Sequence, residues 1–428
     1  MSVFHVVAIL AILLLGALFS LVLAEPGLAY RIDRPSYDIE SHEFAGLMAS
    51  LVDVPVFHGG QVDVLSNGKD FYAAQLAAIG QARRSVHLEA FVFWPSPVAG
   101  RFLDALTERA RSGVKVRLVI DAIGSISTPN RYFAALREAG GQVVWYQPVR
   151  WHTLKRFNNR THRELLIIDG ETGFIGGAGI ADNWIAESEA APPWRDRVLQ
   201  VSGNLVGGLQ ASFVENWLES TGEVLCAAED FPHCRATVDT KGPASPLGLI
   251  VNSTPSAGCS TRARILFQLL LACARERIQI QSPYFLPDAS VRAELLRART
   301  RGVEVEIILP GKHNNVPLAR RASRRHYGQL LAAGVVIHEF LPGMNHTKVL
   351  IIDQLWSVLG STNFDSRSFG LNDEVNIALA DRHLAARLNE DFELDRAASE
   401  RMTLAVWGRR SPRERVLAFL GIALERQQ

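Results

Sequence analysis

The sequence predicts an α/β protein made of two tandem halves, and three observations support this prediction. Strand-like apolar runs alternate with amphipathic helical segments along the chain. The 428 residues are enough for two domains that each bury a core. Three kinds of segment also recur later in the chain in the same order, which indicates an internal duplication. The pairs are SVHLEAFVF (85–93) with RIQIQSPYF (277–285), GVKVRLVID (113–121) with GVEVEIILP (302–310), and THRELLIIDGETGFIGGAG (161–179) with NHTKVLIIDQLWSVLGSTN (345–363).

The first element is an apolar segment without charged residues, from Val3 to Ala24. As a helix it would extend about 33 Å, against about 30 Å for the core of a bilayer. Residues 1–24 are therefore predicted to be a single-pass anchor in the cell membrane. A cleaved signal peptide is the alternative, because Val22-Leu23-Ala24 resembles a cleavage site. Arg31 and Arg34 follow the segment and no Lys or Arg precedes it, which favours a cytoplasmic body.

The first half follows a mixed, polar stretch. Residues 25–55 are expected to form a linker with a docking helix, and residues 56–220 the first domain. Near its start, VDVLSNGKDFYAAQLAAIGQARRSV predicts a strand, an Asn-Gly turn and a helix. Phe71, Leu76 and Ile79 lie on the buried face of that helix. The domain closes with the helical segment LVGGLQASFVENWL.

The second half repeats this organisation. Residues 221–260, rich in Ser, Pro, Gly and Thr, are expected to connect the halves, and residues 261–428 to form the second domain. Its last segment, SPRERVLAFLGIALERQQ, is predicted to be a packed C-terminal helix, and a helix on the membrane surface is the alternative. Two short apolar runs, Val349 to Ile352 and Trp356 to Leu359, predict a β-hairpin.

Polar residues lie at both ends of that hairpin. His346 and Lys348 are two residues apart, so an extended chain presents both side chains on one face. Asp353 ends the first strand, and Ser361 and Asn363 follow the second. This pattern resembles the signature of the phospholipase D superfamily. The resemblance implies two α-β-α sandwich halves related by pseudo-two-fold symmetry, with one motif from each half meeting in a shared active site.

The copy in the first half is altered. His162 and Asp169 have the same spacing as their counterparts, but Glu164, Gly177 and Gly179 replace the lysine, the serine and the asparagine. A glycine at 177 is familiar in cardiolipin synthase-like members, where backbone N–H groups can face a phosphate. Glu164 is the more serious departure, because it reverses the charge where the family holds a phosphate oxygen.

Two explanations of Glu164 compete. The first half has decayed into a scaffold, or a guanidinium from Arg160, Arg163 or Arg195 supplies the lost charge while Glu164 orients it. A hydrogen bond to a charged group contributes about 1.5–3 kcal/mol, so a replacement would matter. The second explanation is favoured, because decay should not spare the histidine and the aspartate of the motif.

Cleavage of a phosphodiester needs a nucleophile, an acid for the leaving oxygen and donors for the phosphoryl oxygens. Two imidazoles can provide the first two without a metal or a cofactor, and neither is expected. The resemblance implies a phosphohistidine intermediate, with His162 as the nucleophile and His346 as the acid; the reverse order is the alternative. The expected phosphate-binding residues are Lys348, Ser361, Asn363 and Gly177.

Four carboxylates complete the set of candidates. In the family a downstream acid orients the opposite histidine, and Glu374 in LNDE and Asp196 in WRD match that position. For Asp196, an ion pair with a neighbouring arginine is the alternative. Asp169 and Asp353 are counted with the catalytic candidates as members of the motifs. However, each lies seven residues beyond its histidine without a second carboxylate at ligand spacing, so a structural role is favoured over a metal site.

The expected substrate is a phospholipid. The chain has 45 basic and 44 acidic residues, which disfavours nucleic acid as a partner. Three stretches resemble bacterial cardiolipin synthases: FIGGAGIADNW (174–184), IQSPYFLPD (280–288) and GSTNFDSRSFGLNDE (360–374). The resemblance implies phosphatidyl transfer at the membrane with phosphatidylglycerol as substrate. The alternatives are a phospholipase D-type lipid hydrolase, a nucleic-acid phosphodiesterase and a non-catalytic membrane scaffold.

Overall fold

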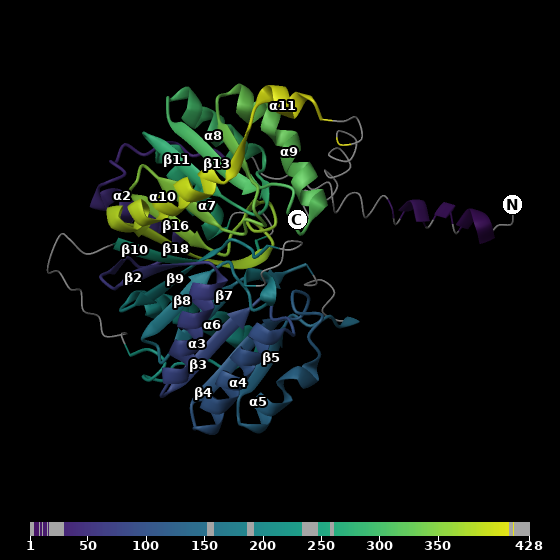
Figure 1. Ribbon diagram of the computed structural model, residues 1–428, viewed down its shortest axis with the longest axis vertical. Helices are drawn as coiled ribbons and strands as arrows, with labels where there is room; N and C mark the ends of the chain where they lie inside the picture. The colour runs from purple at the N-terminus through teal and green to yellow at the C-terminus, as the bar shows by residue number, and fades with distance from the viewer. Residues whose placement is uncertain are drawn as a thin grey trace.

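The computed structural model describes two halves that lie against each other, with the first half blue to teal and the second green to yellow in Figure 1. The described residues are 4–7, 9–10, 12–14, 16, 30–151, 158–185, 192–232, 247–256, 261–410 and 414.

The first half contains a seven-stranded sheet in the order β2-β9-β8-β7-β3-β4-β5. The strands β3, β4 and β5 run parallel, and the other neighbours are antiparallel. The helices α3, α4 and α5 pack on one face, and α6 packs on the other. The bounds are β2 (Val62–Ser66), α3 (Gly68–Gln81), β3 (Ser85–Ala90), α4 (Pro97–Arg111), β4 (Lys115–Asp121), α5 (Ala134–Glu138), β5 (Gln142–Tyr146), β7 (Glu164–Ile168), β8 (Thr172–Gly176), β9 (Arg197–Ser202) and α6 (Leu205–Thr221).

The second half is built on a sheet with the main order β1-β10-β18-β16-β15-β11-β13-β14-β19. Its helices α7, α8 and α9 cover one face, and α10 packs against the other. The bounds are β1 (Phe57–His58), β10 (Leu247–Ser253), α7 (Arg262–Cys273), β11 (Arg277–Gln281), α8 (Ala289–Thr300), β13 (Glu304–Pro310), α9 (Pro317–Ala332), β14 (Val336–Phe340), β15 (Val349–Ile352), β16 (Trp356–Gly360), β18 (Asn372–Ala380), α10 (Arg382–Ala397) and β19 (Ser399–Met402).

The two sheets confirm the duplication. The order β10-β18-β16-β15-β11-β13-β14 repeats the order β2-β9-β8-β7-β3-β4-β5, strand for strand. The strands alternate buried side chains between their faces, so Leu166 packs under α3 and α4 while Leu165 faces α6. The face that carries α6 also packs against β15, β16, β18 and α10. A shared apolar core therefore holds the two halves together.

The segment before the first sheet packs with the second half. Helix α2 (His42–Val52) buries Phe44 against Trp356, and the indole Nε1 of Trp356 donates to the carbonyl of Ile39 at 2.9 Å. Strand β1 pairs with β10. Strand β10 itself falls within 221–260, where only a connection was expected, because the apolar run LGLIV completes the second sheet.

The predicted anchor is only partly described. Residues 4–7, 9–10 and 12–14 are helical and exposed, and the rest of the segment up to residue 24 is mostly outside the described residues. Within the part of the chain that is described, no helix has the length and apolar character needed to cross a bilayer. The anchor therefore stays a prediction, as does the C-terminal helix, since 411–428 is described only at Glu414.

The aspartates of the two motifs have a structural role. The carboxylate of Asp169 accepts from the backbone N–H groups of residues 83–85 at 2.7–3.2 Å, and that of Asp353 from residues 275–277 at 2.8–2.9 Å. Both adopt left-handed backbone, with φ of 56° and 52°. Each lies at the strand end remote from its histidine, roughly 20 Å away along an extended chain. These contacts support the structural role favoured for both residues, as clamps between hairpin and sheet.

Candidate active site

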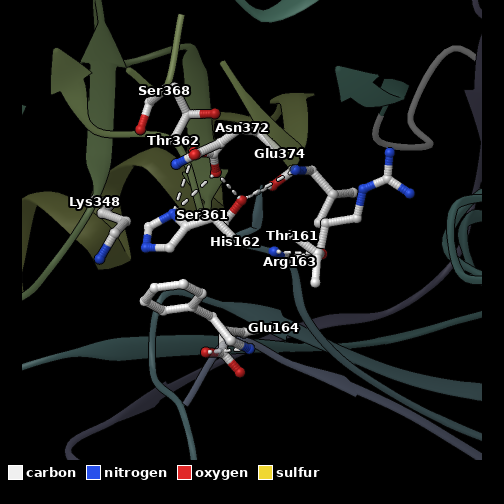
Figure 2. Close-up of polar contacts among 12 residues, drawn as sticks. Thr161, His162, Arg163, Glu164, Lys348, Ser361, Thr362, Ser368, Asn372 and Glu374 are labelled. Atoms are coloured by element: carbon white, nitrogen blue, oxygen red, sulfur yellow. Dashed lines mark hydrogen bonds and ion pairs between the residues drawn. The ribbon is translucent and has the colours of Figure 1, made fainter. Parts of the chain in front are cut away.

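The first histidine lies at the junction of the halves. Strand β6 (Arg160–Thr161) pairs with the start of β18, and the backbone N–H of His162 donates to the carbonyl of Asp373 at 2.9 Å. This pairing brings Nδ1 of His162 to 3.2 Å from both carboxylate oxygens of Glu374. Figure 2 shows His162 and Glu374 facing each other. The acid of the second half thus holds the histidine of the first half.

Glu374 is itself fixed by neighbours. It is fully buried, and it accepts hydrogen bonds from the Ser361 hydroxyl and, at 3.2 Å, from the side-chain amide of Asn372 (Figure 2). Ser361, expected at the phosphate, donates its hydroxyl to this carboxylate in the structure. A carboxylate held in this way can accept the Nδ1–H of His162, which would place the ring lone pair on Nε2.

The second histidine has the reciprocal arrangement. Nδ1 of His346 lies 2.8 Å from Oδ2 of Asp196, a residue of the first half. The same carboxylate oxygen accepts from the indole Nε1 of Trp184 at 3.1 Å, and the backbone N–H of His346 donates to the carbonyl of Arg195 at 2.7 Å. Each half therefore supplies one imidazole and the carboxylate that orients the other.

The alternative for Asp196, an ion pair with a neighbouring arginine, is not what the structure describes. The guanidinium groups of Arg195 and Arg197 both bind Asp391 and Asp395 of α10. These buried ion pairs join the two halves, and they leave Asp196 to His346.

Aromatic rings surround both histidines. The ring of His346 lies 5.5 Å from Trp184, 5.3 Å from Trp194 and 6.5 Å from Tyr284, measured between centroids. The ring of His162 packs edge to face on Phe91 at 5.2 Å. None of these four residues was predicted as a site residue, because each is far in sequence from the motif that it contacts.

Lys348 and His346 share one face, as predicted. The ammonium Nζ lies 3.3 Å from Nε2 of His346 and 3.1 Å from its carbonyl oxygen. Burial lowers the pKa of Lys348, and burial together with the Lys348 charge lowers the pKa of His346 to about 4, against the opposing effect of Asp196. A Cβ on Gly177 would lie 2.7 Å from Nζ, so this glycine leaves room for the lysine to reach the first half.

Glu164 has no arginine partner among the described residues. Its Oε1 accepts from the backbone N–H groups of Phe91 and Val92 at 3.2 and 3.3 Å, and burial raises the pKa of the carboxyl well above its usual range. The expected replacement of the lysine by a guanidinium is therefore wrong. The three arginines are engaged elsewhere: Arg160 with Asp121, Arg163 with Glu215 and Arg195 with Asp395.

The close packing around Gly179 explains why a glycine replaces the asparagine of the motif in the first half. A Cβ on Gly179 would lie 2.6 Å from Cβ of Val92 and 3.0 Å from Oε1 of Glu164, so an asparagine does not fit there. Its counterpart Asn363 is buried, and its Oδ1 has no partner within the described structure. The two halves thus contribute unequally: the second supplies the ammonium and the amide, and the first supplies glycines.

The described residues contain no group of three or more His, Cys, Asp or Glu side chains placed to hold a metal ion. Two oriented imidazoles and an ammonium in one buried site can carry out nucleophilic and acid–base chemistry on a phosphodiester. Together with the duplicated α/β fold, this arrangement defines the class of phospholipase D-like proteins.

Comparison with known proteins gives the family. The model for "cardiolipin synthase, PLD-like domain" matches residues 76–189 and 268–396. The probable cardiolipin synthase YwiE of Bacillus subtilis is 32% identical over 343 residues, covering 80% of this chain and 67% of that protein. Cardiolipin synthase A of Pseudomonas putida is 34% identical over 367 residues, covering 83% and 73%. The chain belongs to the cardiolipin synthase family of phospholipase D-like enzymes, as the sequence resemblance predicted.

A solved structure supports the fold. The phosphatidylserine synthase of Haemophilus influenzae superposes with a TM-score of 0.71 at 15% identity, covering 90% of this chain and all of that one. At this identity the likeness concerns the fold of the two halves.

Proposed function

We propose that the protein is a phosphatidyltransferase of the cardiolipin synthase type, which moves the phosphatidyl group of phosphatidylglycerol to the headgroup hydroxyl of a second phosphatidylglycerol. Membership of the family supports the reaction class. The observation that carries the proposal is the reciprocal pairing, in which Glu374 holds His162 and Asp196 holds His346 across the junction of the halves.

The proposed reaction has two displacements at phosphorus. In the first, Nε2 of His162 forms a P–N bond, the P–O bond to glycerol breaks, and His346 gives a proton to the leaving oxygen. In the second, His346 takes the proton of the acceptor hydroxyl, the new P–O bond forms and the P–N bond breaks. The phosphoryl oxygens are held by the ammonium of Lys348 and by the side-chain N–H of the buried Asn363, which donates to them.

The assignment of His162 as the nucleophile and His346 as the acid rests on the contacts of their ring nitrogen atoms. Among the described contacts, the His162 ring is hydrogen-bonded only through Nδ1, whereas the ammonium of Lys348 lies 3.2 Å from Nδ1 and 3.3 Å from Nε2 of His346. Burial and the Lys348 charge lower the pKa of His346 to about 4, which suits a base more than an acid. A bound phosphate anion would attract Lys348 away from the ring and raise the pKa of His346, so that it can carry the proton.

The location is part of the proposal. The charge-free segment 1–24 anchors the chain in the cell membrane, and its described apolar side chains, such as Phe4 and Ile12, are exposed. The arginines that follow it favour a body on the cytoplasmic side.

Product analysis tests the reaction. Purified full-length protein is incubated with phosphatidylglycerol labelled in the glycerol headgroup, with and without EDTA. Cardiolipin with released glycerol is the expected result in both samples. Phosphatidic acid as the main product would mean hydrolysis, and no product would favour a scaffold with a decayed first half.

A second substrate distinguishes the roles of the two histidines. Phosphatidyl-p-nitrophenol has a leaving group that needs no proton. His346→Ala should therefore keep a burst of p-nitrophenol on this substrate, and His162→Ala should lose it. The opposite pattern would exchange the two roles, and full activity in His162→Ala would end the two-histidine proposal.

A further inference from the structure

Four loops at the edge of the site share an unusual composition. We call them the rim loops: residues 122–131, 147–151, 311–316 and 341–345. They contain no Asp or Glu, although the chain has 44 acidic residues, and they carry Arg131, Arg150 and Lys312. The four loops are therefore positive in a chain whose formal net charge is only +1.

The first two rim loops contact the His162 motif. They follow the parallel strands β4 and β5, whose carboxyl ends meet at the same edge of the sheet. The carboxylate of Asp121, just before residues 122–131, accepts from the backbone N–H of Thr161 at 3.1 Å. The guanidinium of Arg160 donates to the carbonyl of Gln147 at 2.8 Å.

The other two contact the His346 motif. Residues 341–345 lead directly into His346, and the carbonyl of Met344 accepts from the backbone N–H of Arg195 at 2.8 Å. In 311–316, the side chain of Asn315 accepts from the hydroxyl of Tyr284, whose ring lies beside His346. The rim loops thus border both halves of the active site.

These loops also expose large apolar side chains. Trp151 is 85% exposed and Ile126 is 76% exposed, the two highest values for large hydrophobic residues in the described part of the chain after residue 30. Val149 and Leu341 are also exposed, at 53% and 44%. Exposed aliphatic and aromatic groups beside cations are typical of surfaces that enter the headgroup region of an anionic bilayer.

We propose that the rim loops dock on the surface of a bilayer that contains anionic phospholipid, with Ile126 and Trp151 inserted between the headgroups. The proposal rests on the proposed function, because the substrate would then pass from the bilayer to the histidines without crossing water. The rim is a contact separate from residues 1–24: the apolar segment keeps the chain at the membrane, and the rim turns the site towards it.

The test compares one chemistry on two physical forms of substrate. In the first assay, full-length protein is reconstituted in vesicles of phosphatidylglycerol and phosphatidylcholine, and its rate on the vesicle phosphatidylglycerol is measured. In the second, the substrate is short-chain phosphatidylglycerol, which is monomeric below its critical micelle concentration. The double variant Ile126→Ser, Trp151→Ser should lose about tenfold on vesicles through burial of two apolar groups, and keep its rate on the monomeric substrate. Lys312→Ala should lose about fivefold on vesicles, with the loss reduced by salt.

Two matched controls lie away from the rim. Tyr37→Ser removes a side chain that is 49% exposed beside Asp38, whose carboxylate pairs with Arg275 at the edge of the second sheet remote from the site. Arg111→Ala removes an exposed cation at the carboxyl end of α4, which is the opposite edge of the first sheet. Neither should change the ratio of vesicle rate to monomer rate. Thermal unfolding checks that each variant folds.

A direct readout completes the test. Brominated phosphatidylcholine in the vesicles should quench part of the tryptophan fluorescence of the wild type, and Trp151→Phe should remove that part. The proposal is overturned by unchanged vesicle rates, by equal losses on both substrates, or by cross-linking through Trp151 that joins two copies of the chain. Failure of the wild type on the monomeric substrate would instead count against the proposed function.

Discussion

The carboxylate of Glu374 lies 3.2 Å from Nδ1 of His162, although the two residues belong to opposite halves of the chain. Asp196 and His346 repeat this relationship in the other direction, at 2.8 Å. A single half therefore contains a histidine without the acid that orients it. The reciprocal contacts make the site depend on the apolar core and on the buried ion pairs that hold the halves together.

The first prediction concerns Glu374→Gln. A glutamine can donate an N–H to Nδ1 of His162, which would favour the tautomer that carries its proton on Nε2 and would remove the nucleophilic lone pair. We expect the rate of transfer to fall about 10²–10⁴-fold with the fold preserved. Initial rates on short-chain phosphatidylglycerol and thermal unfolding measure the two effects. Exposed Glu276→Gln is the control, and a loss smaller than tenfold would contradict the role given to Glu374.

Local patterns in the sequence account for much of the fold and of the motif. The run from Val349 to Ile352 forms β15 with those bounds, and the run from Trp356 forms β16, because branched apolar residues suit a buried strand. The adjacency of His346 and Lys348 follows from the two-residue period of an extended chain. The duplication was predictable for the same reason, since each copy repeats these local patterns.

The features that could not be predicted from the sequence depend on contacts between distant segments. The partners of Glu164 are backbone N–H groups of a loop some seventy residues earlier. Every residue except proline has such a group, so the sequence does not indicate which ones will bind a side chain. The packing of α2 on the second half and of Trp184 on His346 is equally remote. For Ser361, the motif gave the right position but not the partner, because Glu374 reaches the hydroxyl only after β16 and β18 pair.

A second prediction concerns Gly177→Ala. The new methyl group would lie 2.7 Å from Nζ and 2.9 Å from Cδ of Lys348, and a flexible side chain yields more easily than backbone does. We expect stability to change by less than about 1 kcal/mol and activity to fall about tenfold or more, as the ammonium leaves its place. Gly207→Ala on α6, where nothing lies within 4 Å, is the control and should keep full activity. Wild-type activity in Gly177→Ala would contradict the placement of Lys348.

The third prediction concerns Glu164. Glu164→Gln keeps the oxygen that accepts from Phe91 and Val92, and burial raises the pKa of the carboxyl, which favours the neutral form that glutamine imitates. We expect activity within about threefold of the wild type. Glu164→Lys restores the family residue but leaves both N–H groups without their acceptor and adds a second buried cation near Lys348, so we expect a loss of about 2–4 kcal/mol in stability. Denaturant unfolding and transfer rates check both, and higher activity in Glu164→Lys would show that the site lacks a lysine.

A fourth prediction distinguishes a structural role of Asp353 from a catalytic one. Asp353→Ala removes the acceptor of three backbone N–H groups and places an alanine at φ 52°. We expect stability to fall by about 2–4 kcal/mol. Asp353→Asn should lose less, because asparagine tolerates left-handed backbone and keeps one acceptor oxygen. The folded fraction of both variants should transfer phosphatidyl groups at nearly the wild-type rate, and a large loss of rate per folded molecule would return Asp353 to the catalytic set.

The last prediction is a pH dependence of stability at His87, away from the reaction. The ring is buried, stacks on Phe213 and contacts Gln210 and Arg117, and burial lowers its pKa from 6.5 to about 4. A histidine with a lowered pKa in the folded state stabilises the fold above pH 6.5, and this contribution is lost as the pH falls towards 4, because the unfolded chain binds the proton first. At pH 5 the loss amounts to about 2 kcal/mol.

His87→Gln tests this with a residue that the second half uses at the matching position, where Gln279 bonds Asn389. The difference in unfolding free energy between variant and wild type should shift in favour of the variant by about 2 kcal/mol between pH 7.5 and pH 5. The buried Glu89 and Asp373, whose raised pKa values act in the opposite direction, are present in both proteins and cancel in the difference. Equal pH slopes for the two proteins would show that His87 is protonated as readily in the folded chain as in the unfolded one.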